Sequence, residues 1–189
     1  MKKTFLFLAC CMLYVASQAQ VKVGADKNFT KSLNDYKTYA WSSSIDQIPS
    51  DQIFIAPGGV YVFNNESVRS RIKNAIEYEL SAKGYQKVQN DPDILVLFTV
   101  TERPGKLRTY NGYELIDNGL DSVRTPNNVE VTNIDAGTLI INLVDAKTGV
   151  VAWQGYASGI LKPDMINDNT KVREAVASIF SKFDFKAKQ

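Results

Sequence analysis

Residues 137–159, GTLIINLVDAKTGVVAWQGYASG, decide the fold. Two stretches rich in apolar and β-branched residues, 137–145 and 150–161, flank a short polar segment at 145–149. Such composition is typical of strands, and Gly149 stands where a tight turn needs a positive φ. The pattern predicts an antiparallel hairpin.

Two further stretches predict strands of the same sheet. Residues 94–101, ILVLFTVT, begin with side chains that are apolar on both faces, which is typical of a central strand. In DYKTYAW at 35–41, aromatic and polar residues alternate, so Tyr39 and Trp41 share one face of a half-buried strand.

Two amphipathic helices are predicted from apolar residues at three- and four-residue spacing. The first covers about 66–83, with Asn64 or Asn65 as N-cap and Gly84 as the C-terminal stop. The second covers about 170–183 and begins after Asp168 or Asn169. The inner faces are Val68, Ile72, Ala75, Ile76 and Leu80, and Val172, Ala175, Val176, Ile179, Phe180 and Phe183.

These elements predict one α+β domain over 20–189: a mainly antiparallel sheet with two helices packed on one face. The hairpin and the strand at 94–101 should form the centre of the sheet. No internal repeat or change of composition marks a second domain.

Residues 103–133 are rich in Gly, Asn and Pro and contain few apolar residues. They predict a long polar loop or a loose hairpin. Tyr110 and Tyr113 lie within this segment, which makes them the candidate residues for contact with a partner or ligand.

Residues 1–19 have the features of a secretory signal peptide. Lys2 and Lys3 precede an apolar run at 5–15, and small residues follow at 16–19. A membrane-spanning helix would need roughly 20 apolar residues. We predict cleavage between Ala19 and Gln20 and export to the periplasm or the outer membrane; a buried N-terminal helix is the alternative.

A lipid anchor is not expected, although Leu8-Ala9-Cys10 resembles the approach to a lipidated cysteine. Cleavage before Cys10 would leave only residues 4–9 as the apolar core, which is shorter than the roughly 7–15 residues that such signals use.

The composition excludes several classes of site. The chain has 22 Lys plus Arg, 20 Asp plus Glu and no histidine, and its two cysteines, Cys10 and Cys11, belong to the predicted signal peptide. Without imidazole or thiol, hydrolase triads of the usual form and structural zinc sites are excluded. Loss of Lys2 and Lys3 leaves a formally neutral chain, so no nucleic-acid partner is predicted.

Carboxylate chemistry remains, as in glycoside hydrolysis or a calcium site. Asp91 and Asp93 flank Pro92 before the strand at 94–101, where a turn capped by Asp is the preferred interpretation. Asp164 and Asp168 share only their acidity with a calcium loop, and helix capping is preferred there.

Hydroxyl and aromatic groups give no stronger candidate. Ser67, Ser70 and Lys73 lie on one helix, where a solvated face is preferred over a Ser–Lys pair. Trp41, Trp153 and Tyr156 could stack on a sugar, but strand periodicity favours the core for the tryptophans. We predict no catalytic set, no cofactor and no bound metal.

The sequence resembles the bacterial domain of unknown function 4136, which is often found in envelope lipoproteins. The resemblance rests on DYKTYAW at 35–41, AKGY at 82–85, DPDILV at 91–96, the hairpin at 137–159 and VREAVASIFSKF at 172–183. It implies an α+β envelope domain without an assigned activity. This chain departs from the common pattern because it lacks a convincing lipidation cysteine.

Two functions are compatible with these features. The favoured one is a non-catalytic envelope module that binds another envelope protein or a cell-wall component. The alternative is a carboxylate-dependent hydrolase or a small-ligand-binding protein. No transmembrane segment is expected in the mature chain.

Overall fold

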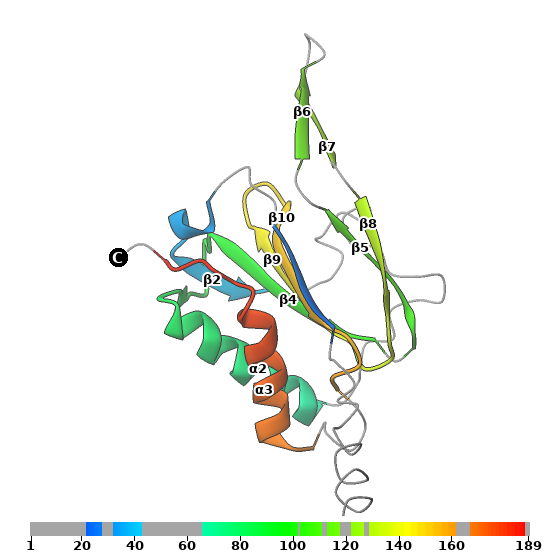
Figure 1. Ribbon diagram of the computed structural model, residues 1–189. Coiled ribbons are helices and arrows are strands. Elements are labelled where there is room, and N and C mark those ends of the chain that lie inside the picture. The colour runs from blue at the N-terminus through cyan, green and yellow to red at the C-terminus, as the bar shows by residue number, and fades with distance from the viewer. Residues whose placement is uncertain are drawn as a thin grey trace, which may run out of the picture.

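The computed structural model describes residues 22–27, 32–42, 66–101, 103–110, 113–117, 122–126, 129–161 and 167–187 (Figure 1). Its elements, in chain order, are β1 (Val23–Lys27), the 3₁₀-helix η1 (Leu33–Asp35), β2 (Thr38–Trp41), α2 (Glu66–Ala82), β3 (Gln86–Lys87), β4 (Ile94–Val100), β5 (Gly105–Tyr110), β6 (Tyr113–Asp117), β7 (Ser122–Pro126), β8 (Val129–Ile134), β9 (Leu139–Asp145), β10 (Val151–Ala157) and α3 (Asn169–Phe180).

The main sheet of the described residues has the strand order β1-β10-β9-β4-β2-β3. β9 pairs antiparallel with both β10 and β4, and Ile141 lies opposite Gly155 on one side and Phe98 on the other. β2 pairs in parallel with β4 and β3. The predicted hairpin and the strand at 94–101 therefore do form the centre of the sheet.

The edge strand β1 was not predicted from the sequence. β1 pairs antiparallel with β10, and Val23 lies opposite Ala157. An edge strand has a neighbour on one side only and needs little apolar sequence, so the short pattern Val-Gly-Ala gave no clear strand signal.

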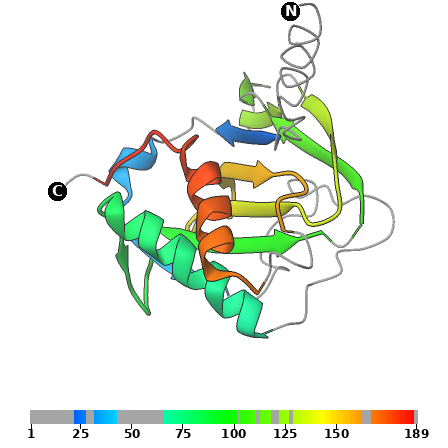
Figure 2. The ribbon, with the colours of Figure 1, turned by 60° about the horizontal axis from the view of Figure 1, so that its bottom comes forward.

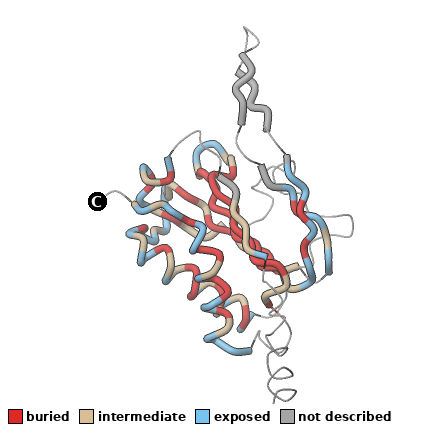
Figure 3. Tube along the Cα trace, in the orientation of Figure 1, coloured by how far each residue is buried: buried red, intermediate tan, exposed pale blue. Residues whose placement is uncertain are grey.

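Both helices cover one face of the sheet, as predicted (Figure 2). The apolar positions predicted for each helix are buried, and they pack with Val96, Ile141, Trp153 and other strand residues in one core cluster. Figure 3 shows that buried residues concentrate on the central strands and on the helix faces turned toward them. The α+β fold class is confirmed.

The helix ends follow the expected capping chemistry. Gly84 has φ +88° just after α2. Asp168 caps α3, because its carboxylate accepts hydrogen bonds from the backbone N–H groups of Thr170 and Lys171. Asn64 and Asn65 lie outside the described residues. Neither described helix is long and apolar enough to cross a membrane.

The prediction of a long polar loop at 103–133 is wrong, and the alternative of a loose hairpin is nearer to the structure. β5 pairs antiparallel with β8, and β6 with β7, so that the β6–β7 ribbon continues from the end of the β5–β8 ribbon (Figure 1). Leu107 and Ile134 pack against Ile140 and Tyr156 on the sheet face opposite the helices. These few apolar side chains anchor the ribbon although its sequence is mostly polar.

Candidate functional site

α2 and α3 run in the same direction across the sheet. Near their N-terminal ends, Arg71 Nη1 donates a hydrogen bond to Asn167 Oδ1 over 3.5 Å. Just past their C-terminal ends, Lys83 Nζ donates to the Phe183 carbonyl over 2.8 Å. The two helices lie side by side on one face of the sheet (Figure 2). Two adjoining hollows are lined by residues of both helices and share Ala75, Tyr78 and Arg173; together we call them the helix groove.

The larger hollow of the helix groove has a volume of about 630 Å³. Ala75, which is 5% exposed, lies at its base. Its polar lining comes from both helices and consists of hydroxyl, amide and guanidinium groups: Ser67, Ser70, Arg71, Asn74, Asn169 and Arg173.

Tyr78 is the most prominent side chain of the helix groove. It is 60% exposed, one of two large hydrophobic residues exposed among the described residues. The guanidinium carbon of Arg173 lies 5.1 Å from the centroid of the Tyr78 ring, within the range of a cation–π contact. This contact holds the Arg173 side chain against the aromatic ring at the boundary of the larger hollow.

A smaller hollow of about 360 Å³ continues the groove toward the C-terminal ends of the helices. Tyr78 and Arg173 line both hollows, whereas Glu79 and Glu174 line only the smaller one. The helix groove therefore has one end rich in hydrogen-bond donors and one end with carboxylates.

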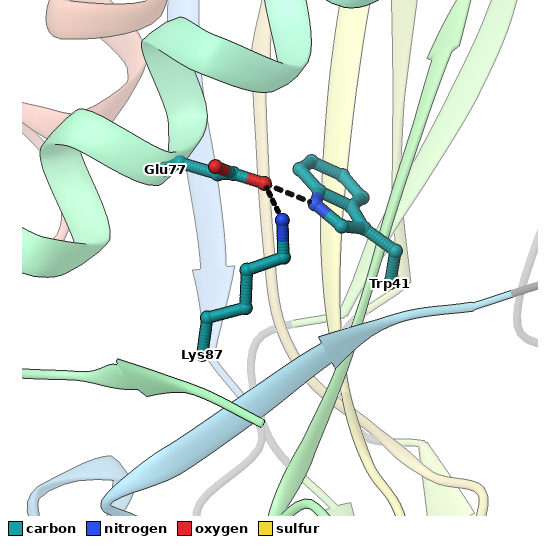
Figure 4. Close-up of polar contacts among 3 residues, drawn as sticks. All are labelled: Trp41, Glu77 and Lys87. Carbon is teal, nitrogen blue, oxygen red and sulfur yellow. Dashed lines mark hydrogen bonds and ion pairs between the residues drawn. The ribbon is translucent and has the colours of Figure 1, made fainter. Parts of the chain in front are cut away.

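The opposite side of α2 carries a charged stripe at four-residue spacing. The Arg69 guanidinium lies 5.3 Å from the Phe98 ring centroid, and Lys73 Nζ lies 5.4 Å from the Trp41 ring centroid. One turn further, Glu77 Oε1 accepts hydrogen bonds from Trp41 Nε1 over 2.7 Å and from Lys87 Nζ over 2.5 Å (Figure 4). Glu77 thereby joins α2 to β2 and β3.

Two described carboxylates, Glu77 and Asp145, have pKa values below the ordinary values of their side chains, which favours their ionised form. Burial alone would raise the pKa of Glu77, but hydrogen bonds from Lys87 and Trp41 bring it below its ordinary value. Burial likewise opposes ionisation of Asp145, yet hydrogen bonds from the Tyr36 hydroxyl and the backbone of Thr148 and Lys147 lower its pKa. A general acid would need a raised pKa.

The described residues contain no group of three or more Asp, Glu, Cys or His side chains placed to hold a metal ion. The helix groove presents hydrogen-bonding groups, charged side chains and one exposed aromatic ring.

A family model described as "Domain of unknown function (DUF4136)" matches residues 21–183. The protein belongs to the DUF4136 family. No curated protein matches the chain.

Several solved structures are similar to this chain at low sequence identity. The crystal structure of a DUF4136 family protein from Bacteroides thetaiotaomicron is 15% identical with a TM-score of 0.53, and the match covers 86% of this chain and 95% of that one. A PDZ domain protein from Parabacteroides distasonis is 17% identical with a TM-score of 0.47, covering 89% and 36%. The PelC dodecamer from Paraburkholderia phytofirmans is 12% identical with a TM-score of 0.44, covering 90% and 100%.

The predicted contact residues of this DUF4136 domain lie at the ends of two successive strands. Tyr110 ends β5 and Tyr113 begins β6. Their side chains lie outside the part of the structure that is described, as do Ala19 and Gln20 of the predicted cleavage site and Asp164.

The structure explains the other candidates as structural residues of the DUF4136 domain. Asp93 Oδ2 accepts hydrogen bonds from the backbone of Lys37 and Thr38, and Asp91 has φ +48° in the turn before it. Trp153 and Tyr156 are 0% and 5% exposed and belong to core clusters, and Trp41 is partly buried.

No Ser–Lys pair forms on α2, because Ser67 and Ser70 line the helix groove while Lys73 lies over Trp41 on the other side. Sequence reasoning missed Tyr78 and Arg173. The available signal was an aromatic residue on α2 outside the buried spacing, but its partner stands 95 positions later and only the packing of the two helices brings it near.

Proposed function

We propose that the protein is an exported, non-catalytic module of the bacterial cell envelope that binds an envelope protein or a cell-wall component. Export is supported by Lys2, Lys3, the apolar run at 5–15 and the small residues before Gln20. The mature chain would then begin at Gln20, without a lipid anchor, in the periplasm or at the outer membrane.

The observation that carries the binding role is the helix groove around Tyr78. An aromatic ring that is 60% exposed lies beside a hollow of about 630 Å³. Ligand pockets span roughly 300–1,000 Å³ and combine aromatic surface with a few polar groups, and exposed aromatic residues often anchor interfaces. Against the hydrolase alternative, the lowered pKa values of Glu77 and Asp145 keep both carboxylates ionised, so neither holds the proton that a general acid must donate.

The proposal includes a second contact at Tyr110 and Tyr113. Figure 1 shows the β6–β7 ribbon extending from the end of the β5–β8 ribbon, away from the six-stranded sheet. The two tyrosines stand where one ribbon continues into the other.

Export and processing are tested by intact-mass measurement. The full chain is produced with its own N-terminus in a bacterial host, and the periplasmic fraction is purified. The proposal expects a chain that starts at Gln20, free or as pyroglutamate, without acylation. A mass that shows a lipid on Cys10 or Cys11, or retention of residues 1–19 in the cytoplasm, would overturn this part.

The binding role is tested by affinity capture from envelope extracts with the tagged mature protein. Tyr78→Ala should abolish capture through the helix groove, and a Tyr110→Ala, Tyr113→Ala double variant should weaken capture through the ribbons. Val131→Ala, at a β8 position that is 52% exposed, is the matched control and should capture like wild type. Equal capture by all variants would contradict both contact surfaces.

A further inference from the structure

We infer that the helix groove binds a saccharide that carries one carboxylate. This inference rests on the proposed function, because it names the class of ligand for the same surface.

The first step is the balance of charge in the larger hollow. Arg71 and Arg173 line it, and no described Asp or Glu side chain does. A guanidinium presents several N–H donors in a planar fork that matches the two oxygens of a carboxylate. Arg173 therefore gives the larger hollow a group suited to an anion.

The second step is the orientation of Arg173. The Arg173 guanidinium contacts the Tyr78 ring. Among the described residues, no carboxylate forms an ion pair with Arg173. Holding the side chain against the ring reduces the conformational entropy that binding would otherwise cost, while the N–H edges stay available to a ligand. Arg71 is placed from the other helix, where Nη1 donates to Asn167 Oδ1.

The third step separates a saccharide from a peptide. Besides Tyr78, Ala75 is the one nonpolar residue among the described residues that line the larger hollow. A peptide would find no apolar pocket for its side chains there, and recognised peptides usually dock such anchors. A sugar presents a hydroxyl on most carbons, which suits Ser67, Ser70, Asn74 and Asn169, and its flat C–H face suits an exposed aromatic ring.

The fourth step limits the ligand to one carboxylate. Glu79 and Glu174 line the smaller hollow and would repel a second anionic group there. Their oxygens accept hydrogen bonds from neutral hydroxyls instead. The carboxylate of the sugar is therefore expected at Arg173 in the larger hollow, with neutral hydroxyls or a neutral neighbouring sugar toward Glu79.

The test is an NMR titration of the mature protein with four probes: D-glucuronate, the neutral D-glucuronamide, acetate and glucose 6-phosphate. Chemical-shift changes should map to 67–78 and 169–177 with glucuronate. Affinity for glucuronamide should be at least about tenfold lower, as expected for loss of a charge-assisted hydrogen bond. Acetate keeps the carboxylate but lacks the sugar, so it should also bind more weakly than glucuronate. Arg173→Gln should weaken glucuronate binding about tenfold or more. Lys171→Gln removes the same charge from α3 at a position outside the groove lining and should leave binding within about twofold.

Equal binding of glucuronate and glucuronamide, or an Arg173→Gln variant that binds like wild type and melts at the same temperature, would overturn the inference. Binding of glucose 6-phosphate in preference to glucuronate would overturn the carboxylate in favour of phosphate. If none of the sugars binds while envelope capture still depends on Tyr78, the inference fails and the proposed function stands. If capture depends neither on Tyr78 nor on Tyr110 and Tyr113, both fail.

Discussion

The Tyr36 hydroxyl donates a hydrogen bond of 2.5 Å to Asp145 Oδ2, across 109 positions of sequence. The other carboxylate oxygen of Asp145 accepts from the backbone N–H groups of Lys147 and Thr148. One carboxylate therefore orders the β9–β10 turn and ties it to the segment that follows η1. Both side chains are buried, at 2% and 9% exposure.

Replacing Tyr36 with Phe should destabilise the protein by about 1–3 kcal/mol, because it leaves a buried carboxylate oxygen without its hydroxyl donor. Urea unfolding at neutral pH measures the change. Tyr78→Phe removes a hydroxyl from an exposed ring and should stay within about 0.5 kcal/mol of wild type. Equal stability of the two variants would show that the Tyr36–Asp145 bond contributes nothing net.

Stability should fall in acid. The folded-state pKa values of Asp145 and Glu77 are lowered, so the folded chain binds fewer protons than the unfolded chain as the pH approaches these values. The contribution is present above the unfolded pKa values of about 4 and is lost as pH falls through the folded ones. Asp145→Asn should be less stable at pH 7 and should lose less stability between pH 5 and pH 2. If the free energy of unfolding fell equally for wild type and for Asp145→Asn between pH 5 and pH 2, this account would be wrong.

Stability should also fall in strong base. Burial is the main cause that raises the pKa of Tyr36, and its hydrogen bond to Asp145 is the second cause. Burial also raises the pKa of Tyr39 and of Tyr85. The folded state therefore retains protons that the unfolded state loses above about pH 10, and stability declines as pH rises from there. The same described groups predict little change between pH 6 and 8. A loss of more than about 1 kcal/mol across that window would indicate a carboxyl with a raised pKa and would favour the hydrolase alternative.

Ile141→Asp should unfold the protein. Ile141 is fully buried in β9 between two paired strands, and burial of an unpaired carboxylate costs several kcal/mol, comparable with the roughly 5–15 kcal/mol stability of a whole domain. Val131→Asp places the same charge in β8 at a position that is 52% exposed and should leave the fold intact. Circular dichroism separates the two results, and a cooperative melt of Ile141→Asp near the wild-type temperature would contradict the sheet assignment.

Gly137→Ala and Gly149→Ala should differ although both glycines have positive φ. A Cβ at Gly149 meets no atom within 4 Å, so the cost is the conformational strain of about 1–2 kcal/mol. A Cβ at Gly137 would overlap the Leu161 carbonyl oxygen, and the added displacement of backbone should make this variant clearly less stable. Equal unfolding midpoints in urea would show that the Leu161 segment moves aside freely.

The central part of the fold was predictable because its signals are local. The buried spacing of α2 and the apolar run of β9 each follow from neighbouring residues, and Asp168 caps α3 through amides two and three positions away. The β5–β8 ribbon was not predictable, because Leu107 and Ile134 are buried through contact with Ile140 and Tyr156, which belong to other strands. Local composition showed only a polar segment.

The candidate site could not be predicted from local sequence either. Each residue of the helix groove looks like part of an ordinary solvated helix face in the sequence, as Ser67 and Ser70 did. Tyr78 and Arg173 become neighbours only because α2 and α3 pack together, and the Lys83–Phe183 hydrogen bond is one of the contacts between the segments that end them. Such long-range pairing has no counterpart in periodicity or spacing.

The placement of the first and last described segments also governs when the chain can fold. β1 pairs with β10, and Phe183 completes the core against Tyr85 and Trp153, while the Ala187 N–H bonds to the Lys83 carbonyl. A growing chain on the ribosome therefore lacks a complete core until residues 183–187 are synthesised. Contacts of such large sequence separation also slow folding. This delay in folding is compatible with the proposed export, because the chain would still be unfolded when it reaches a translocation channel.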